Sequence, residues 1–447
     1  MSETSSKKMG VVQLTIITAV NMMGSGIIML PAKLASVGTI SVLSWLVTAV
    51  GSMCLAYCFA QCGMFSRKSG GMGGYTEYAF GKAGNFLCNY TYAFSLIIAN
   101  VAIAISAVGY GTEFLGTQLS ALGVGLATIA VLWVTGVLNF GGASITGKIG
   151  SFTIWGVLIP VFGISILGWF WFSPSMYAAA WNPYNMPFFE AVSTSITLTL
   201  WAFLGLESAC ANMDAVENPE KNVPIAVLGG TLGAAIVYIA STNVMSGIVP
   251  IAELANSNAP FGYVFAQMFN ETTGQIVMGL MCIACLGSLL GWQFTTAQVL
   301  KSLADDGYFP KIFSKVTSAN APIAGMTIMM IIETAIGFAT ISPSLMEQFN
   351  AIVELAVVTN LVPYVLSMAA LPVILQEAQV SKKKIGPILF VNILAVLYSF
   401  YALYACGEFS LAYGGLVTFL GWVFYGYIAY NQKNNDNSRM PHVESIS

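Results

Sequence analysis

Charged residues are scarce in this chain: Asp, Glu, Lys and Arg make up 8% of its 447 residues, and 57% are hydrophobic. A soluble domain usually has about 25% charged residues, so this composition excludes an ordinary soluble globular protein. It indicates instead a polytopic membrane protein whose surface contacts lipid. We therefore expect no nucleic acid among its partners.

Histidine is almost missing, and no spacing typical of metal ligands occurs. The single histidine, His442, lies in the polar C-terminal tail, and no nucleophile is accompanied by a base. An enzyme is therefore the least favoured class, and we expect no metal and no cofactor. The eight cysteines lie in or beside apolar runs, which indicates reduced thiols. Cys282 and Cys285 have redox-motif spacing, but their place in a hydrophobic helix argues against redox chemistry.

Long hydrophobic runs are abundant, and twelve of them reach the roughly 20 residues needed to cross a bilayer. Basic residues occur before the first run and in every second connection, and Lys33 alone breaks this alternation. By the positive-inside rule, both termini are predicted to be cytoplasmic. The intervening connections hold Glu113, Glu253, Glu271 and Glu347. The runs lie near 11–31, 39–60, 86–111, 122–140, 150–173, 190–213, 223–248, 274–299, 322–341, 350–374, 386–406 and 409–430.

The first run contains Gly24, Ser25 and Gly26, which form helices poorly. In a membrane, unwound backbone is tolerated only where protein or a water-filled cavity satisfies its polar groups. The triplet therefore predicts a helix break near the middle of the bilayer. The N–H groups of the half-helix that follows would bind a carboxylate. The alternative is a face of small residues for helix packing.

The sixth run has a matching interruption at Leu204 and Gly205, and it crosses the membrane in the opposite direction. A break there leaves the carbonyl groups of residues 201–204 as the negative end of a half-helix, which suits an ammonium group. Two interrupted helices, five runs apart and opposite in direction, are typical of an inverted repeat with the substrate site at its interface. The position of the breaks, rather than likeness between the halves, predicts this repeat.

Three glutamates lie within apolar runs. Glu207 follows the second break, and an ionisable group at that depth costs about 2.5–3.5 kcal/mol, which marks it as a functional candidate. It is a candidate proton carrier or coupling group, and the alternative is a protonated glutamate bonded to a backbone carbonyl. For Glu333 we favour a helix-packing contact over a substrate contact. For Glu354, near the start of its run, interfacial solvation is the simpler interpretation.

A glycine-rich stretch and several aromatic residues complete the candidates. Residues 69–78 contain four glycines but no Walker lysine, so we favour a hinge or cytoplasmic gate over a phosphate loop. Glu77 in this stretch is either a contact for a cationic substrate or a solvated loop acid. Trp292 is a candidate for stacking on an ammonium, which gains about 0.5–2 kcal/mol. Tyr425 is interpreted first as an interfacial-belt residue and second as a pocket residue.

Seven short motifs occur along the chain: MGSGI at 23–27, LP at 30–31, WAFLGLES at 201–208, ENP at 217–219, NVP at 222–224, GW at 291–292 and DDGYFP at 305–310. Together these motifs resemble the basic amino acid/polyamine antiporters of the amino acid–polyamine–organocation superfamily. The resemblance extends to about Tyr430. It implies an all-α membrane protein of twelve transmembrane helices, with a LeuT-like five-plus-five inverted repeat, discontinuous helices 1 and 6, and two extra helices. Residues 1–430 would form one transporter domain, with repeats at about 11–173 and 190–374 and helices 11 and 12 at about 386–430, and 431–447 a cytoplasmic polar tail.

The resemblance also implies roles for individual residues. Backbone N–H groups of the first break would bind the carboxylate of an amino acid, and the carbonyls of Trp201 and Leu204 its ammonium. Trp292 would stack on the substrate, and Glu207 would be the proton-sensitive carboxylate. The expected substrate-binding residues are Gly24, Ser25, Gly26, Asn100, Trp201, Leu204, Glu207 and Trp292. The gate or path candidates are Cys62, Glu77, Tyr92 and Tyr425.

The activity implied by the resemblance is exchange of intracellular putrescine for extracellular ornithine, by alternating access across a bacterial inner membrane. Putrescine uptake driven by the membrane potential or by protons is a second mode. A homodimer and a functional link to an ornithine decarboxylase are further expectations. The alternatives are a lysine–cadaverine or other basic amino acid/polyamine exchanger and a sodium- or proton-coupled amino acid symporter of the same fold. A channel or a transporter-like sensor also stays open.

Overall fold

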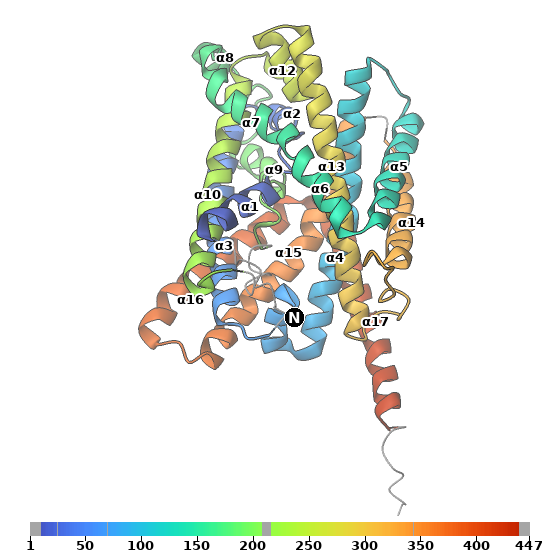
Figure 1. Ribbon diagram of the computed structural model, residues 1–447. Coiled ribbons are helices and arrows are strands. Elements are labelled where there is room, and N and C mark those ends of the chain that lie inside the picture. Colours follow the sequence, from blue (N-terminus) through green and yellow to red (C-terminus); the bar gives the residue numbers. More distant parts are fainter. Residues whose placement is uncertain (1–9, 25, 69, 208–215, 343, 438–447) are drawn as a thin grey trace, which may run out of the picture.

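The computed structural model describes residues 10–24, 26–68, 70–207, 216–342 and 344–437, and every regular element in these ranges is a helix. The long helices stand side by side in one bundle (Figure 1). They are α3 (Val42–Phe65), α4 (Gly71–Leu115), α5 (Ala121–Leu138), α6 (Ala143–Thr153) continued by α7 (Trp155–Leu167), α10 (Pro219–Ser246), α13 (Glu271–Asp305), α15 (Leu345–Glu377), α16 (Lys382–Ala405) and α17 (Gly407–Asn437).

The shorter elements connect or cover the long ones. Helices α8 and α12 lie at one end of the bundle, and α17 extends from the other end (Figure 1). The short helices are α1 (Val11–Met22), α2 (Leu30–Ala35), α8 (Pro174–Ala179), α9 (Phe188–Trp201), α11 (Ile251–Ala255), α12 (Pro260–Met268) and α14 (Ile323–Ala339), with 3-10 turns at Thr39–Ser41, Asn139–Gly141 and Gly168–Phe170.

Nine helices in the described part of the chain are long and apolar enough to cross a membrane, which agrees with nine of the twelve predicted runs. The other three runs contain the shorter helices α1, α9 and α14. Two of these three, α1 and α9, belong to the runs in which a break was predicted. Their helices are short because each run is interrupted before it reaches the length of a full span.

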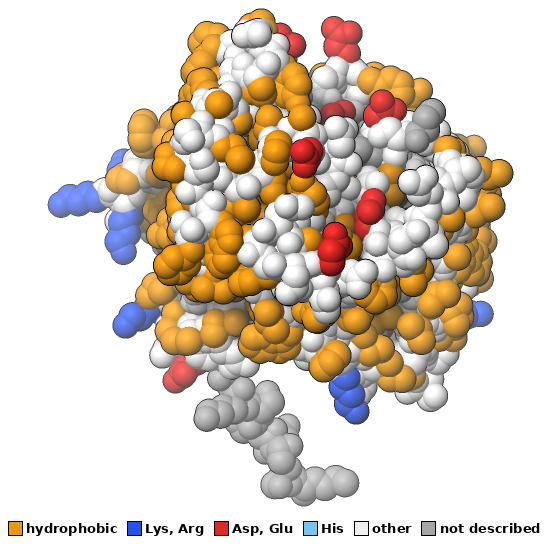
Figure 2. Space-filling model, turned by 90° about the horizontal axis from the view of Figure 1, so that it is seen from above, with side chains coloured by type: hydrophobic (Ala, Val, Ile, Leu, Met, Phe, Trp, Pro, Cys, Tyr) orange, Lys and Arg blue, Asp and Glu red, His pale blue; other side chains and the backbone are white. Residues whose placement is uncertain are grey.

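Helix α4 lies at the centre of the bundle, where it packs against α13 and α15. In its most apolar window 89% of the residues are buried, against 11% for α17, which therefore lies at the outside. Exposed large hydrophobic side chains on α5, α16 and α17 form a surface suited to lipid. Figure 2 shows hydrophobic side chains around the margin of the molecule, and acidic side chains both near the middle of this face and at its upper edge.

In the glycine-rich stretch that we expected to be a hinge or cytoplasmic gate, residues 71–78 are helical and Gly70 precedes the helix with a φ of 95°, while Ser69 is outside the described residues. Helix α4 begins at Gly71, and its non-helical residue is Gly81, with φ 60° and ψ −155°. A methyl group added at Gly73 would lie 2.2 Å from Nδ2 of Asn89, so the segments on either side of Gly81 pack tightly together. This packing overrides the low helix propensity of glycine, and the bend lies beyond the predicted stretch.

Candidate functional site

Both predicted interruptions are present in the backbone. Helix α1 ends at Met22 and α2 begins at Leu30, and the described residues between them are not helical. Helix α9 ends at Trp201, and the chain continues through tight turns in which the Leu204 N–H donates to the Trp201 carbonyl at 3.3 Å. Gly205 then adopts a φ of +106°, a conformation that favours glycine. Ser25 and residues 208–215, which include the predicted end of the sixth run, lie outside the described residues.

The two interrupted segments touch each other directly. A methyl group added at Gly26 would lie 3.1 Å from the Cα of Ala202 and 3.5 Å from the Trp201 carbonyl oxygen. A methyl group added at Gly205 would lie 3.3 Å from the carbonyl oxygen of Asn21. Glycine therefore allows the backbones to approach more closely than any other residue would. Because of this approach, the free ends of both helices face one shared space.

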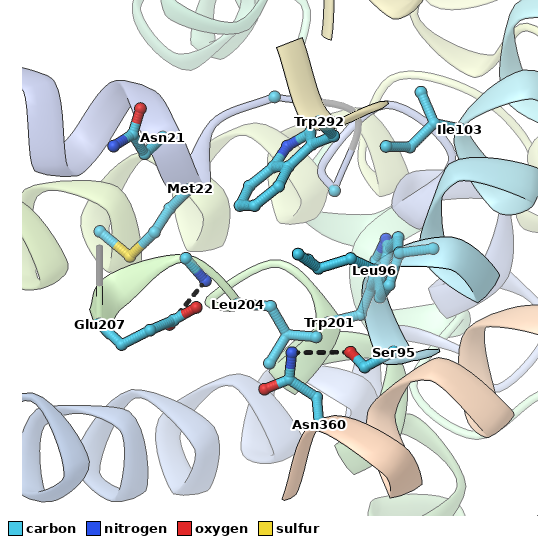
Figure 3. Close-up of a pocket in the computed structure, with 14 residues that line it drawn as sticks. Asn21, Met22, Ser95, Leu96, Ile103, Trp201, Leu204, Glu207, Trp292 and Asn360 are labelled. Atoms are coloured by element: carbon cyan, nitrogen blue, oxygen red, sulfur yellow. Dashed lines mark hydrogen bonds between the residues drawn. The ribbon is translucent and has the colours of Figure 1, made fainter. Parts of the chain in front are cut away.

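That space is an internal cavity, drawn in Figure 3. Among its described lining residues, Glu207 has the only ionisable carboxyl or amino group. The cavity brings together six of the eight predicted substrate-binding residues: Gly24, Gly26, Trp201, Leu204, Glu207 and Trp292. The lining residues are Asn21, Met22, Gly24, Gly26, Ser95, Leu96, Ala99, Ile103, Trp201, Leu204, Gly205, Glu207, Trp292 and Asn360.

Glu207 is held by three donors from three parts of the fold. Its Oε1 accepts a hydrogen bond from the Tyr92 hydroxyl of α4 at 3.0 Å. Its Oε2 accepts one from the Gly205 N–H at 3.1 Å and another from the Tyr364 hydroxyl of α15. Donors on both oxygens fit a carboxylate better than a protonated acid bonded to a backbone carbonyl. Glu207 therefore connects the second break to both central helices.

Trp292 of α13 covers the second break from the other side. A methyl group added at Gly205 would lie 3.6 Å from Cζ2 of this indole, so the ring lies against the unwound backbone. Figure 3 shows the ring reaching across the cavity toward Met22. The indole N–H of Trp201 is buried and has no hydrogen-bond partner among the described residues. The cavity thus offers an aromatic face, a carboxylate and a donor, which suits a small cation with a polar group.

Ser95 and Asn360 are two of the polar lining residues that the sequence analysis missed. Asn360 of α15 donates through Nδ2 to the Ser95 hydroxyl of α4 at 2.9 Å (Figure 3). Its Oδ1 is buried and has no partner within the described structure, so it is an acceptor that faces the site region. The available signal was an asparagine inside an otherwise apolar run. That signal does not say which face of the helix the amide occupies.

Asn100, predicted to contact substrate, is not among the lining residues. Its Nδ2 donates to Oε1 of Glu333 at 2.8 Å and makes a longer contact of 3.4 Å with the Thr296 hydroxyl. Its neighbour Ala99 lines the cavity instead. Glu333 itself is fully buried. The role of Asn100 in binding stays a prediction.

The gate and path candidates do not form one cluster. Tyr92 reaches the site through Glu207, as described above. Glu77 forms an ion pair with Lys68 at 3.2 Å and accepts from Asn85 at 2.9 Å, so it is a bonded helical residue rather than a loop acid. Cys62 is buried near the end of α3. Tyr425 of α17 packs on Phe86, with ring centroids 5.5 Å apart. None of these last three lines the cavity.

A bundle of apolar helices enclosing a cavity between two unwound segments defines a class of protein, the multi-pass membrane transporters. Comparison with protein families agrees with this class: the model of the family described as amino acid permease matches residues 9–425. The chain therefore belongs to the amino acid permease family, and it is a transporter rather than an enzyme.

Three relatives resemble this chain over nearly its whole length. The putrescine transporter PotE of Escherichia coli strain K12 is 66% identical over 96% of this chain and 98% of its own length. PotE of Haemophilus influenzae is 67% identical over 95% of this chain and 98% of its own length. The cadaverine/lysine antiporter of Escherichia coli K12 is 35% identical over 94% of this chain and 95% of its own length.

Proposed function

We propose that this chain is a secondary transporter that exchanges intracellular putrescine for extracellular ornithine by alternating access. The observation that carries the proposal is Glu207, the ionisable acid of a cavity enclosed by two unwound segments. Such a site binds a small organic cation. The identity of 66% to proteins named putrescine transporter favours a diamine over other cations.

The site would bind the two poles of the substrate at the two breaks. N–H groups around Gly24 and Gly26, together with Ser25, would donate to the carboxylate of ornithine. The carbonyls of Trp201 and Leu204 would accept from its ammonium, because a carbonyl oxygen has two lone pairs and the internal bond to Trp201 uses one. Trp292 would stack on the methylene chain, and Asn360 and Asn100 would add polar contacts.

A single site of this kind can accept both substrates in turn. Putrescine and ornithine share a chain of methylene groups that ends in an ammonium, and only ornithine has a carboxylate. When putrescine is bound, the N–H groups of the first break would be left to water. One carboxylate, Glu207, then faces a substrate cation in both cases, and it would serve as the proton-sensitive group of the cycle.

The exchange has a defined electrical cost. Putrescine carries two positive charges outward and ornithine carries one inward, so one net charge leaves the cell if no proton moves. Against about 100 mV this costs about 2.3 kcal/mol. This cost is offset when the outward concentration ratio of putrescine multiplied by the inward concentration ratio of ornithine reaches roughly 50. An ornithine decarboxylase inside the cell would maintain these ratios and consume a proton, and uptake of putrescine alone would use the potential or a proton.

The proposed setting is a bacterial inner membrane with both termini in the cytoplasm. We infer twelve spans that form a five-plus-five inverted repeat with two extra helices. The domain would cover residues 1–430, with repeats at about 11–173 and 190–374 and a polar tail at 431–447. The alternation of basic and acidic connections along the sequence supports this orientation. We also propose that the protein forms a homodimer.

Counterflow in proteoliposomes tests the function. Vesicles loaded with putrescine should accumulate labelled ornithine faster than labelled lysine, arginine or agmatine. Faster entry of lysine into cadaverine-loaded vesicles would favour the alternative exchanger, which the relative at 35% identity makes the second candidate. Accumulation of labelled ornithine by empty vesicles under a proton or sodium gradient would favour an amino acid symporter. Flux far above the rates of alternating access would favour a channel.

A further inference from the structure

A second buried carboxylate lies outside the cavity and has only neutral partners. Oε1 of Glu333 accepts from Asn100 Nδ2 at 2.8 Å, and Oε2 accepts from Gln293 Nε2 at 2.9 Å. The ion pairs of Lys68 with Glu77 and of Lys301 with Asp305 do not include Glu333. A charged group is buried at high cost unless an opposite charge accompanies it. The protein part of this cluster therefore lacks a cation.

The same cluster has an acceptor that is not used. Asn100 Oδ1 is fully buried and has no hydrogen-bond partner within the described structure, although Nδ2 of the same amide is bonded to Glu333. Buried polar atoms are nearly always paired, so this orphan needs an explanation. An ammonium group has three donors and no acceptor. It is the group that would satisfy the amide oxygen and the carboxylate together.

The cluster lies directly behind the wall of the cavity. Asn100 follows the lining residue Ala99 on α4, and Gln293 follows the lining residue Trp292 on α13. Thr296, which contacts the Asn100 amide, donates its hydroxyl to the Trp292 carbonyl at 2.7 Å. The Trp292 backbone is thus bonded to a residue of the cluster, while Trp292 itself lines the cavity.

We propose that Glu333 and Asn100 form a subsite for the distal ammonium of the substrate, with Gln293 holding the carboxylate in place. This inference rests on the proposed exchange of a diamine for a diamino acid. A diamine carries two positive charges, and the described cavity lining provides one carboxylate for them. Glu333 would supply the second negative charge, and the side-chain ammonium of ornithine would use the same subsite.

Competition binding with paired ligands tests the subsite. Each pair differs only in the distal ammonium: putrescine against butylamine, and ornithine against norvaline. With purified protein, Glu333→Gln should weaken putrescine and ornithine by roughly 30-fold or more while butylamine and norvaline change little. Glu354→Gln is the matched control, because Glu354 is a partly buried carboxylate in α15 that accepts from Ser410. This control should keep the wild-type preference within each pair.

If Glu333→Gln weakens both members of each pair equally, Glu333 only packs helices. If it changes the affinity of neither member, Glu333 does not contact the ammonium. If Glu333→Gln yields no monodisperse protein on size-exclusion chromatography, Asn100→Ser replaces it and should weaken the diammonium ligand selectively. A wild-type protein that binds putrescine well above butylamine but fails to exchange it for ornithine would contradict the proposed function alone.

Discussion

Tyr364 of α15 donates its hydroxyl to Oε2 of Glu207, the same oxygen that accepts the Gly205 N–H. The two residues are 157 positions apart in the sequence. Their contact joins a central helix to the unwound backbone after α9. Any movement of α15 relative to the second break must therefore change the hydrogen bonds of the carboxylate that would face the substrate.

Replacing Glu207 by glutamine should weaken exchange and flatten its dependence on pH. Glutamine keeps the shape of the side chain but has no negative charge and no proton to exchange, so putrescine affinity should fall by roughly 30-fold. Expression should stay intact, since the amide oxygen can still accept from the Gly205 N–H while the amide NH2 group donates to the Tyr92 hydroxyl oxygen. Exchange rates between pH 5 and 9 in reconstituted vesicles provide the measurement. An unchanged pH profile would remove Glu207 from the mechanism.

Tyr364→Phe should slow exchange without unfolding the protein. The change removes one donor to a charged group, a bond worth about 1.5–3 kcal/mol, and so corresponds to a loss of tenfold or more. Tyr238→Phe is the matched control, because the Tyr238 hydroxyl is buried without a partner among the described residues. If both variants transport equally well, the Tyr364 hydroxyl has no part in the cycle.

Gly26→Ala should disrupt transport because the added methyl group would crowd the Ala202 backbone. Such overpacking costs about 1–3 kcal/mol, and here the strain falls on the contact between the two breaks. Gly415→Ala in α17 serves as the control, since nothing lies within 4 Å of its added methyl group. Ornithine-driven putrescine efflux should be lost only in the first variant. Wild-type efflux from Gly26→Ala vesicles would argue against a close crossing of the breaks.

Trp292→Leu should lower putrescine affinity more than it lowers stability. Loss of an ammonium–indole contact costs about 0.5–2 kcal/mol, which corresponds to roughly 2- to 30-fold in affinity. The ring is only partly buried, so a leucine can replace much of its packing. Binding titrations and thermal unfolding of the same preparation compare the two effects. Wild-type affinity in this variant would mean that Trp292 only packs against Gly205.

Features that depend on local sequence were predictable. Long apolar runs locate the helices, and the weak helix propensity of the glycines locates the first break between Met22 and Leu30. The reduced state expected for the cysteines agrees with the seven free thiols among the described residues. The place of Glu207 in the site was also predictable from local sequence, because an acid inside an apolar run is costly unless it has a role.

Features that depend on contacts between distant segments were not predictable. The partners Ser95 and Asn360 are 265 positions apart, so a single sequence gives no sign that they meet. The direction of the Asn100 amide depends on Glu333, 233 positions away. Lys33 broke the charge alternation, and the structure places it buried in α2, 5.8 Å from the centre of the Phe349 ring. Tertiary packing, rather than propensity, decides each of these positions.

The most direct measurement of the central claim is efflux of labelled putrescine from proteoliposomes, with and without ornithine outside. Our account predicts rapid efflux when ornithine is present, slow efflux when it is absent, and loss of the ornithine effect in Glu207→Gln. Efflux that is equally fast without any external substrate, or that continues unchanged in Glu207→Gln, would contradict an exchanger whose site is the cavity between the two breaks.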